Sequence, residues 1–249
     1  MLSAVTLIVR SVSAPNSPQA NLGDAGSRRA GVPYLIVALA LLIFAALAFE
    51  AQKGVIFAID RWMLLALRRP ASPGIPIGPD WLRSSLIDLT ALGGTTVLTL
   101  VTIAAAGYLV VTRAHRLVPF LIAVAVSGSV LDRLLKALLG RERPTIVPHL
   151  VEVSTHSFPS GHAMNSAVVY LTVALVLGHG AARRGARAYL LGLAVALVAF
   201  IGISRVYLGV HFPSDVLGGW LVGGSWVTLC WRATFGRHAL ALGASPARD

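Results

Sequence analysis

The sequence has little charge and almost no cysteine. Only 12% of its 249 residues are Asp, Glu, Lys or Arg, whereas 56% are hydrophobic. A soluble domain of this length needs far more charge to cover its surface, so the composition indicates a membrane protein. The one cysteine, Cys230, lies in an apolar run, which excludes an intrachain disulfide framework and a cysteine-rich metal site. We expect Cys230 to be a small packing residue in a helix.

Acidic residues are scarcer than basic ones, with 10 Asp and Glu against 21 Lys and Arg, which gives a formal net charge of +11. Such a charge can indicate nucleic-acid binding. Here the basic residues are scattered in short loops between apolar runs and form no long basic face, so we expect no nucleic-acid partner. Orientation in a membrane and binding of a phosphate fit these cations better.

Apolar runs of membrane-spanning length fill most of the chain. A helix needs roughly 20 mostly apolar residues to cross a bilayer. Six runs qualify, at about 33–49, 88–112, 117–139, 161–179, 188–208 and 213–231. Between the first two, Asp60 and Arg61 interrupt the apolar residues from Gly54 to Leu67, which predicts an interfacial amphipathic helix. The expected fold class is therefore all-α integral membrane: six transmembrane helices, with an interfacial helix between the first two.

The ends of the chain are expected to be tails. Residues 1–32 combine a short apolar start with a stretch rich in Ser, Pro, Asn and Gly, which predicts a disordered tail, and residues 232–249 form a second, short tail. Residues 33–231 then form the six-helix membrane domain, with both tails on one side. Once the cations discussed below are set aside, the distribution of Lys and Arg favours cytoplasmic tails.

Three polar clusters stand out against the apolar background. They run from Lys136 to Pro144 at the end of the third span, from Pro159 to His162 at the start of the fourth, and from Ser204 to Asp215 between the fifth and sixth. By the parity of the spans, all three emerge on the same face of the membrane. We therefore expect loops that carry chemistry to meet on that face.

The first function that these clusters predict is phosphate binding. Lys136, Arg143 and Arg205 supply three cations, two of them with planar forks that match phosphate oxygens. Ser160 and Gly161 lie where a helix is expected to begin, so free backbone N–H groups also point at an anion.

The second function is phosphoryl transfer. Asp215 lies four residues beyond His211, close enough to fix the tautomer of the imidazole ring and leave its other nitrogen free to attack. His162 remains to protonate the leaving oxygen. Pro213 suits the first turn of the sixth helix. Taken singly, each residue has an ordinary structural explanation, such as a snorkelling lysine or an interfacial histidine; their order and spacing on one face favour a site.

The motifs K-x6-R-P, P-S-G-H and S-R-x5-H-x3-D resemble the three-part signature of the type 2 phosphatidic acid phosphatase superfamily, in its bacterial membrane lipid phosphatase branch. The match is complete at every motif position from Lys136 to Asp215. The resemblance implies that Lys136, Arg143 and Arg205 bind phosphate with help from Ser160 and Gly161. It also implies a phosphohistidine on His211, supported by Asp215.

The resemblance further implies that His162 is the general acid and that the reaction is metal-independent at the extracytoplasmic face of the cell membrane. No cofactor is expected, because two histidines and one aspartate among three cations make a poor site for a divalent ion. The sequence does not assign roles to the other polar residues. Asp132 lies one helical turn before Lys136 and is placed to pair with it, and Asp88, near the start of the second span, is expected to have a structural role. Candidates for contact with the substrate headgroup are Arg141, Glu142, Glu152 and His156.

An amphiphile suits a site at the membrane surface, with its head at the cations and its tail in lipid. The expected partner is a membrane lipid: phosphatidic acid, phosphatidylglycerol phosphate or a polyprenyl pyrophosphate such as undecaprenyl pyrophosphate. A lipid phosphotransferase that passes the phosphoryl group to an alcohol is the nearest alternative. An anion transporter is an alternative of another class, but its polar residues would be spread through the spans rather than gathered at one face.

Overall fold

A computed structural model describes residues 20–179 and 183–242, with side chains over residues 31–179 and 183–236. Residues 1–36 and 37–249 form two separate units. The described residues of the first unit are helical: α1 (Ala20–Gln52) begins inside the segment expected to be a disordered tail. Residues 1–19 lie outside the described part of the chain. The second expected tail, residues 232–249, is helical as far as Leu242.

Helices make up most of the second unit. After α1 come α2 (Ala58–Ala66), β1 (Arg68–Arg69), β2 (Ser72–Pro76), α3 (Asp80–Ala91), α4 (Thr95–Val111), a 3₁₀ turn (His115–Leu117), α5 (Val118–Leu139), α6 (Gly161–His179), α7 (Arg184–Tyr207) and α8 (Pro213–Leu242). The strands β1 and β2 pair antiparallel as a short hairpin. The predicted all-helical character is confirmed apart from this hairpin.

The structure describes four or five candidate membrane crossings, where the sequence predicts six. Within the described residues, four helical segments are long and apolar enough to cross, namely Gly31–Gln52, His115–Leu139, Gly161–His179 and Arg184–Tyr207. A fifth crossing results if α3 and α4, which meet at 54°, count as one broken span. A continuous helix over residues 88–112 is therefore wrong: the chain breaks at Leu92–Gly94, where two glycines follow each other.

Helix α8 occupies the sixth expected run but is not among the segments that are long and apolar enough to cross a membrane. Its sequence includes a series of glycines and Arg232, which lower its hydropathy. The glycines let it lie close to a neighbour: a Cβ on Gly219 would come within 2.7 Å of the Ser160 carbonyl oxygen. Small residues at helix contacts are typical of membrane bundles.

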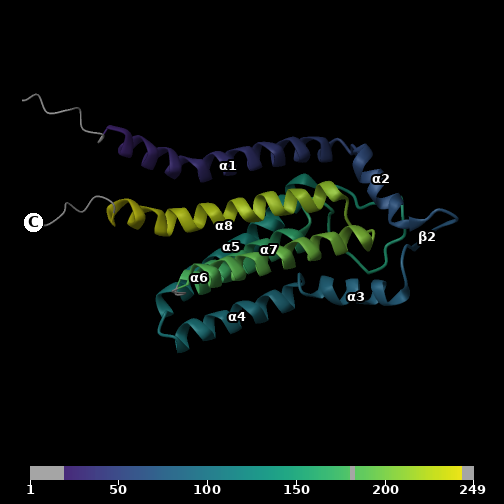
Figure 1. Ribbon diagram of the computed structural model, residues 1–249. Helices are drawn as coiled ribbons and strands as arrows, with labels where there is room; N and C mark the ends of the chain where they lie inside the picture. The colour runs from purple at the N-terminus through teal and green to yellow at the C-terminus, as the bar shows by residue number, and fades with distance from the viewer. Residues whose placement is uncertain (1–19, 180–182, 243–249) are drawn as a thin grey trace, which may run out of the picture. The chain divides into compact units, whose positions relative to one another are not determined.

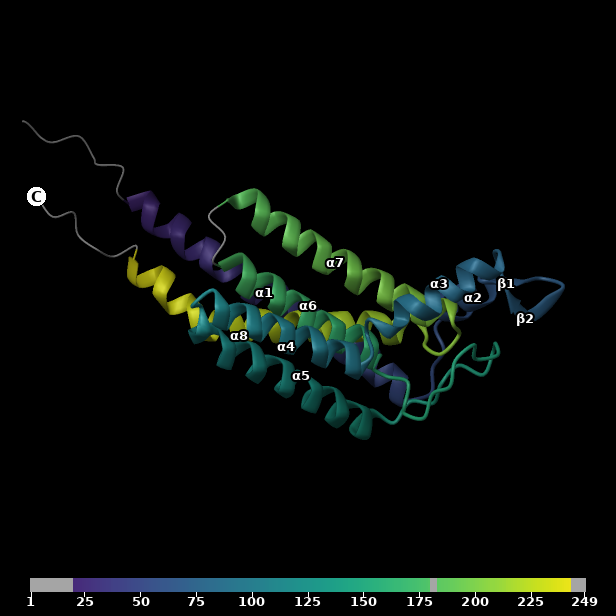
Figure 2. The same cartoon turned by 90° about the horizontal axis from the view of Figure 1, so that it is seen from below.

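The helix at the centre of the packing is α6. It contacts α5, α7 and α8, and Figures 1 and 2 both show these helices side by side. Within its span 56% of residues are buried, against 11% for the α1 span. Leu98 of α4, Val169 of α6 and Ile201 of α7 share one apolar cluster. The polar residues at the start of α6 are thus held by a tightly packed helix.

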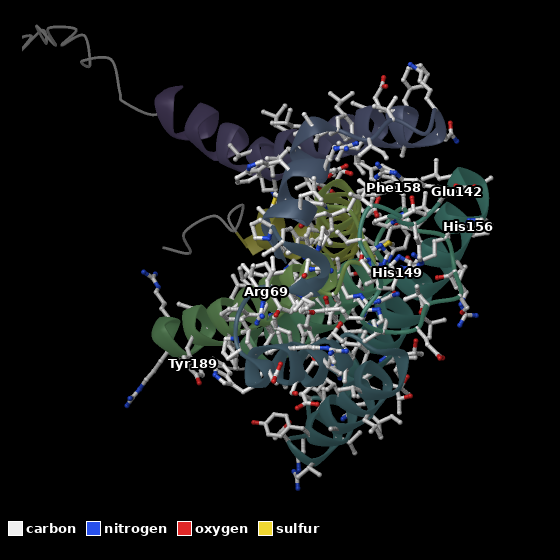
Figure 3. All side chains as sticks on the ribbon, turned by 90° about the vertical axis from the view of Figure 1, so that its right-hand side faces the viewer. Arg69, Glu142, His149, His156, Phe158 and Tyr189 are labelled. Carbon is white, nitrogen blue, oxygen red and sulfur yellow. The ribbon has the colours of Figure 1, made fainter. Side chains whose placement is uncertain are left out.

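One end of the unit collects the loops and short elements that follow α1, α5 and α7. The segment between α5 and α6 is anchored there, since the Leu150 N–H donates to the Leu208 carbonyl at 3.0 Å and Phe158 packs against Ala48 and Ala51. Figure 3 looks onto this end, with Glu142 and His156 on one side of the view and Arg69 on the other.

Helix α2 lies at the same end, within the segment for which the sequence predicts a helix. Its exposed face includes Ile59 and Trp62, which is 64% exposed, whereas Leu64 is fully buried. The finding that sequence reasoning missed is Asp60, which is also fully buried instead of lying at a polar surface.

Candidate active site

The last turn of α5, the first turn of α6, the end of α7 and the first turn of α8 meet at this end of the unit. The predicted starts of α6 at Gly161 and α8 at Pro213 are confirmed. The Ser160 N–H donates to the Asp215 carbonyl at 3.0 Å, so the second and third polar clusters of the sequence are in direct contact. The structure therefore brings all three clusters together on one face of the bundle.

His211 and Asp215 form the buried centre of the site. The ring Nδ1 of His211 lies 3.4 Å from Oδ2 of Asp215, and both side chains are at most 2% exposed. Asp215 is the third residue of α8, and its Oδ2 also accepts the Phe212 N–H at 2.9 Å, as an acidic residue does in a capping box. Because Asp215 occupies the Nδ1 side, the lone pair of a neutral ring lies on Nε2.

The surroundings of His211 keep its ring neutral. Burial lowers the pKa of His211 from 6.5 to about 3; Asp215 opposes this shift through its hydrogen bond and charge, while Arg143 and Arg205 add to it. A neutral imidazole is the form that attacks phosphorus. At neutral pH the ring therefore carries an unprotonated nitrogen.

Arg143 faces the reactive side of the ring. Its Nη1 lies 3.3 Å from His211 Nε2 and donates to the Val210 carbonyl at 2.7 Å, while Nε donates to the Thr155 carbonyl at 2.7 Å. Burial lowers the pKa of Arg143, and the charge of Asp215 opposes this. Two carbonyls thus fix a guanidinium beside Nε2, and a guanidinium is a group that can bind phosphate oxygens.

Lys136 and Arg205 complete the group of cations. Lys136 Nζ donates to the Pro159 carbonyl at 2.5 Å and lies 3.7 Å from Asp132, so the expected pairing of Lys136 with Asp132 is confirmed. Arg205 Nη1 donates to the Thr90 hydroxyl at 3.0 Å, whereas its buried Nε has no partner among the described residues. Thr90 lies in the last turn of α3, just before the break at Leu92–Gly94.

The start of α6 offers further donors. The Ser160 hydroxyl is buried and without a partner in the described part of the chain, which leaves it available to an anion. Gly161 is required for close approach, because a Cβ there would lie 2.9 Å from Asp132 Oδ2 and 3.2 Å from Lys136 Cε. His162 follows on the same turn, within electrostatic range of Lys136, Arg143 and Arg205. All eight residues singled out in the sequence thus converge.

Two other residues contact this centre that the sequence motifs did not indicate. Ser157, which is fully buried, donates its hydroxyl to Asp215 Oδ2 and lies 3.4 Å from His211 Nδ1. Arg141 was a candidate for headgroup contact, but it points inward and its Nη1 donates to Asp215 Oδ1 at 2.5 Å. Nothing in the sequence distinguishes Ser157 from the other loop serines, so only its position reveals it.

The remaining polar candidates lie at the surface of the site. Glu142 and His156 are exposed and line a cavity of about 620 Å³ that also reaches Lys136 and Arg143. Glu152 is exposed and lines a neighbouring cavity. Over the residues that the structure describes, no group of three or more His, Cys, Asp or Glu side chains is arranged to hold a metal ion.

Comparison with known proteins identifies the family. Residues 116–239 match the model of the PAP2 superfamily. The chain is also 34% identical, over 189 residues, to phosphatidylglycerophosphatase B of Bacillus subtilis (strain 168), covering 74% of this chain and 85% of that protein. The chain belongs to the PAP2 superfamily.

A solved PAP2 structure shares the fold. The crystal structure of the transmembrane PAP2 type phosphatidylglycerolphosphate phosphatase from Bacillus subtilis superposes with a TM-score of 0.66 at 26% identity, covering 87% of this chain and 98% of that one. A further PAP2 relative, an undecaprenyl-diphosphatase of Sulfolobus acidocaldarius, is 37% identical over 73 residues, which is 29% of this chain and 31% of that protein. With its apolar helices, this PAP2 chain is a multi-pass membrane protein.

Proposed function

We propose that this chain is a membrane phosphatase that hydrolyses a lipid phosphate or a polyprenyl pyrophosphate through a phosphohistidine on His211. The observation that carries the proposal is the arrangement around the imidazole, with Asp215 on Nδ1 and Arg143 at 3.3 Å from Nε2. A neutral ring held in this way has one free lone pair, and that lone pair faces a cation suited to a phosphoryl oxygen.

In the first step, the phosphoryl oxygens bind Lys136, Arg143 and Arg205, together with the Ser160 hydroxyl and the backbone N–H groups at the start of α6. Nε2 of His211 then attacks phosphorus, and the bond from phosphorus to the leaving oxygen breaks. His162 donates a proton to that oxygen, which departs as an alcohol or as a lipid monophosphate. Asp215 stabilises the positive charge that develops on the ring.

In the second step, water attacks the phosphohistidine, with His162 now accepting a proton from the water. Inorganic phosphate leaves and His211 returns to its neutral form. No divalent ion takes part in either step, because three cations surround the phosphoryl group and would repel a metal. Hydrolysis is preferred over transfer to an alcohol because the named relatives are phosphatases.

The substrate class follows from the position of the site. Lipid phosphates are named in the relatives' activities, as phosphatidylglycerophosphate and as undecaprenyl diphosphate. Phosphatidic acid, phosphatidylglycerol phosphate and undecaprenyl pyrophosphate each place a phosphoryl group at the end of an apolar tail. Such a molecule reaches the cations from the bilayer, while its tail remains among the exposed apolar residues of the helices.

The test is phosphate release by the purified protein in detergent, with EDTA present, over these three lipids. We expect release of inorganic phosphate by the wild type and none above background by His211→Ala. Release at the wild-type rate by His211→Ala would exclude the mechanism, and loss of activity with EDTA would exclude its metal independence. Label transferred from lipid to an added alcohol, in place of free phosphate, would favour the phosphotransferase instead.

We also propose six crossings, with α3 and α4 as one broken span, α8 as the last, and α2 at the membrane surface. The glycine contact of α8 with α6 supports its place in the bundle, and exposed Trp62 on α2 suits an interface. Both ends of the chain then lie in the cytoplasm and the site faces outward. A reporter fused to the C-terminus that is active only outside the cytoplasm should be silent, and an active one would contradict this topology.

A further inference from the structure

A buried ionic cluster joins α2 to the first turn of α8. It comprises Asp60, Arg141, Ser214 and Asp215, all at most 6% exposed. Arg141 is its centre: Nη1 donates to Asp215 Oδ1 at 2.5 Å and to the Ser214 hydroxyl at 2.8 Å, and Nη2 lies 3.4 Å from Asp60 Oδ2. One guanidinium therefore links two carboxylates that come from different helices.

Asp60 also holds the start of α8 directly. Its Oδ1 accepts the Ser214 N–H at 2.8 Å, and its Oδ2 accepts the Ser214 hydroxyl at 2.6 Å. A carboxylate at this position satisfies a backbone N–H that a helix start leaves free and complements the helix dipole. Asp60 is thus bonded both to the residue that precedes Asp215 and to the cation that Asp215 binds.

Arg141 is a buried residue that contacts of its own protein hold in place. Its side chain is 4% exposed, its Nη2 donates to the Val55 carbonyl at 3.0 Å, and its Cζ lies 4.3 Å from the Phe212 ring centre. These contacts hold the guanidinium of Arg141 against Asp215 Oδ1, whereas His211 contacts Oδ2. The charge of Arg141 keeps Asp215 ionised beside Asp60 and aims Oδ2 at His211.

We infer that Arg141 and Asp60 are positioning residues of this enzyme: Arg141 holds Asp215 in place against His211, and Asp60 holds both Arg141 and the first turn of α8. This inference rests on the proposed function, because it assigns a role towards the His211 nucleophile. It also gives α2 a part in catalysis, since this helix carries Asp60 on its buried face and Trp62 on its exposed face.

Removing the charge of Arg141 alone should slow the enzyme more than removing the charges of Arg141 and Asp60 together. Arg141→Gln leaves the buried Asp215 carboxylate without this cation and near the second carboxylate, Asp60, so Asp215 takes up a proton more readily. A protonated Asp215 no longer stabilises the charge on His211. The groups that face Asp215 are His211, Ser157, Arg141 and the Phe212 N–H, with Lys136 and Arg143 within electrostatic range.

For Arg141→Gln we expect kcat to fall by about 10- to 100-fold with little change in KM, and the acid limb of the kcat profile to move to higher pH. Adding Asp60→Asn removes the second carboxylate charge while keeping its shape. The double variant should therefore be about threefold or more faster than Arg141→Gln near pH 6, with its acid limb back towards the wild type. Asp60→Asn alone should lower kcat without raising the acid limb.

The experiment measures kcat, KM and their pH profiles for phosphate release from phosphatidic acid, with Arg61→Gln and Asp80→Asn as exposed controls. A purely structural role predicts that the double variant is the slowest and that the losses are independent of pH; either result overturns the inference. If Arg141→Gln does not fold, an acid limb raised by Asp60→Asn alone overturns it. Failure of the wild type to release phosphate, or activity of His211→Ala, would instead refute the proposed function.

Discussion

Removing one hydroxyl from the centre of the site should slow the chemical step without weakening substrate binding. Ser157 is fully buried, and its hydroxyl contacts Asp215 Oδ2 and His211 Nδ1. In Ser157→Ala, the Asp215 Oδ2 keeps the Phe212 N–H and His211 but loses its hydroxyl donor. A hydrogen bond to a charged group contributes about 1.5–3 kcal/mol. Since about 1.4 kcal/mol is a factor of ten in rate, kcat should fall by about 10- to 100-fold.

The assay is steady-state phosphate release from phosphatidic acid in detergent micelles, with the variant checked for a wild-type elution profile. KM should stay close to that of the wild type, because the Ser157 hydroxyl contacts none of the phosphate-binding cations. Ser85→Ala, at an exposed position on α3, is the matched control and should behave as the wild type. A folded Ser157→Ala whose kcat is within about twofold of the wild type, or whose loss lies entirely in KM, would refute the reasoning.

Two further predictions concern His211 and Gly161 at the start of α6. Burial lowers the pKa of His211 to about 3, so the ring gains a proton only near or below that pH. In a His162→Ala background, the rate of phosphoenzyme formation should therefore stay constant from about pH 8 to about pH 5. In single-turnover mixing, a fall in this rate centred near pH 6.5, the ordinary pKa of histidine, would contradict this. Gly161→Ala should displace Lys136 and lower kcat/KM by about tenfold or more, as overpacking costs about 1–3 kcal/mol. Gly224→Ala, with no atom within 4 Å of the new Cβ, should stay near wild type in the same assay, and equal losses in both variants would exclude the steric explanation.

The parts of the site that the sequence predicts are those specified by local signals. Pro213 begins α8 because a proline suits the first turn of a helix, and Gly161 begins α6 after a serine. The parity of the apolar runs places Lys136 and His211 at the same end of the bundle. Short-range signals and chain length therefore predict the meeting of the three clusters without any knowledge of the packing.

The parts that the sequence does not predict depend on contacts across the chain. Asp60 looks like a polar interruption in an amphipathic helix, and only its pairing with Ser214, 154 residues later, explains why it is buried. The break between α3 and α4 had a local signal in Gly93 and Gly94, but the apolarity on both sides outweighed it. Thr90, which contacts Arg205, lies in the last turn of α3 just before this break.

The most direct test of the account is to trap the phosphoenzyme. Wild-type protein is mixed with radiolabelled phosphatidic acid for less than one turnover, quenched in alkali, where phosphohistidine survives, and digested for peptide mapping. We expect label on Nε2 of His211 in the wild type and none in His211→Ala. Label on another residue, or phosphate release with no labelled protein at any time, would contradict it.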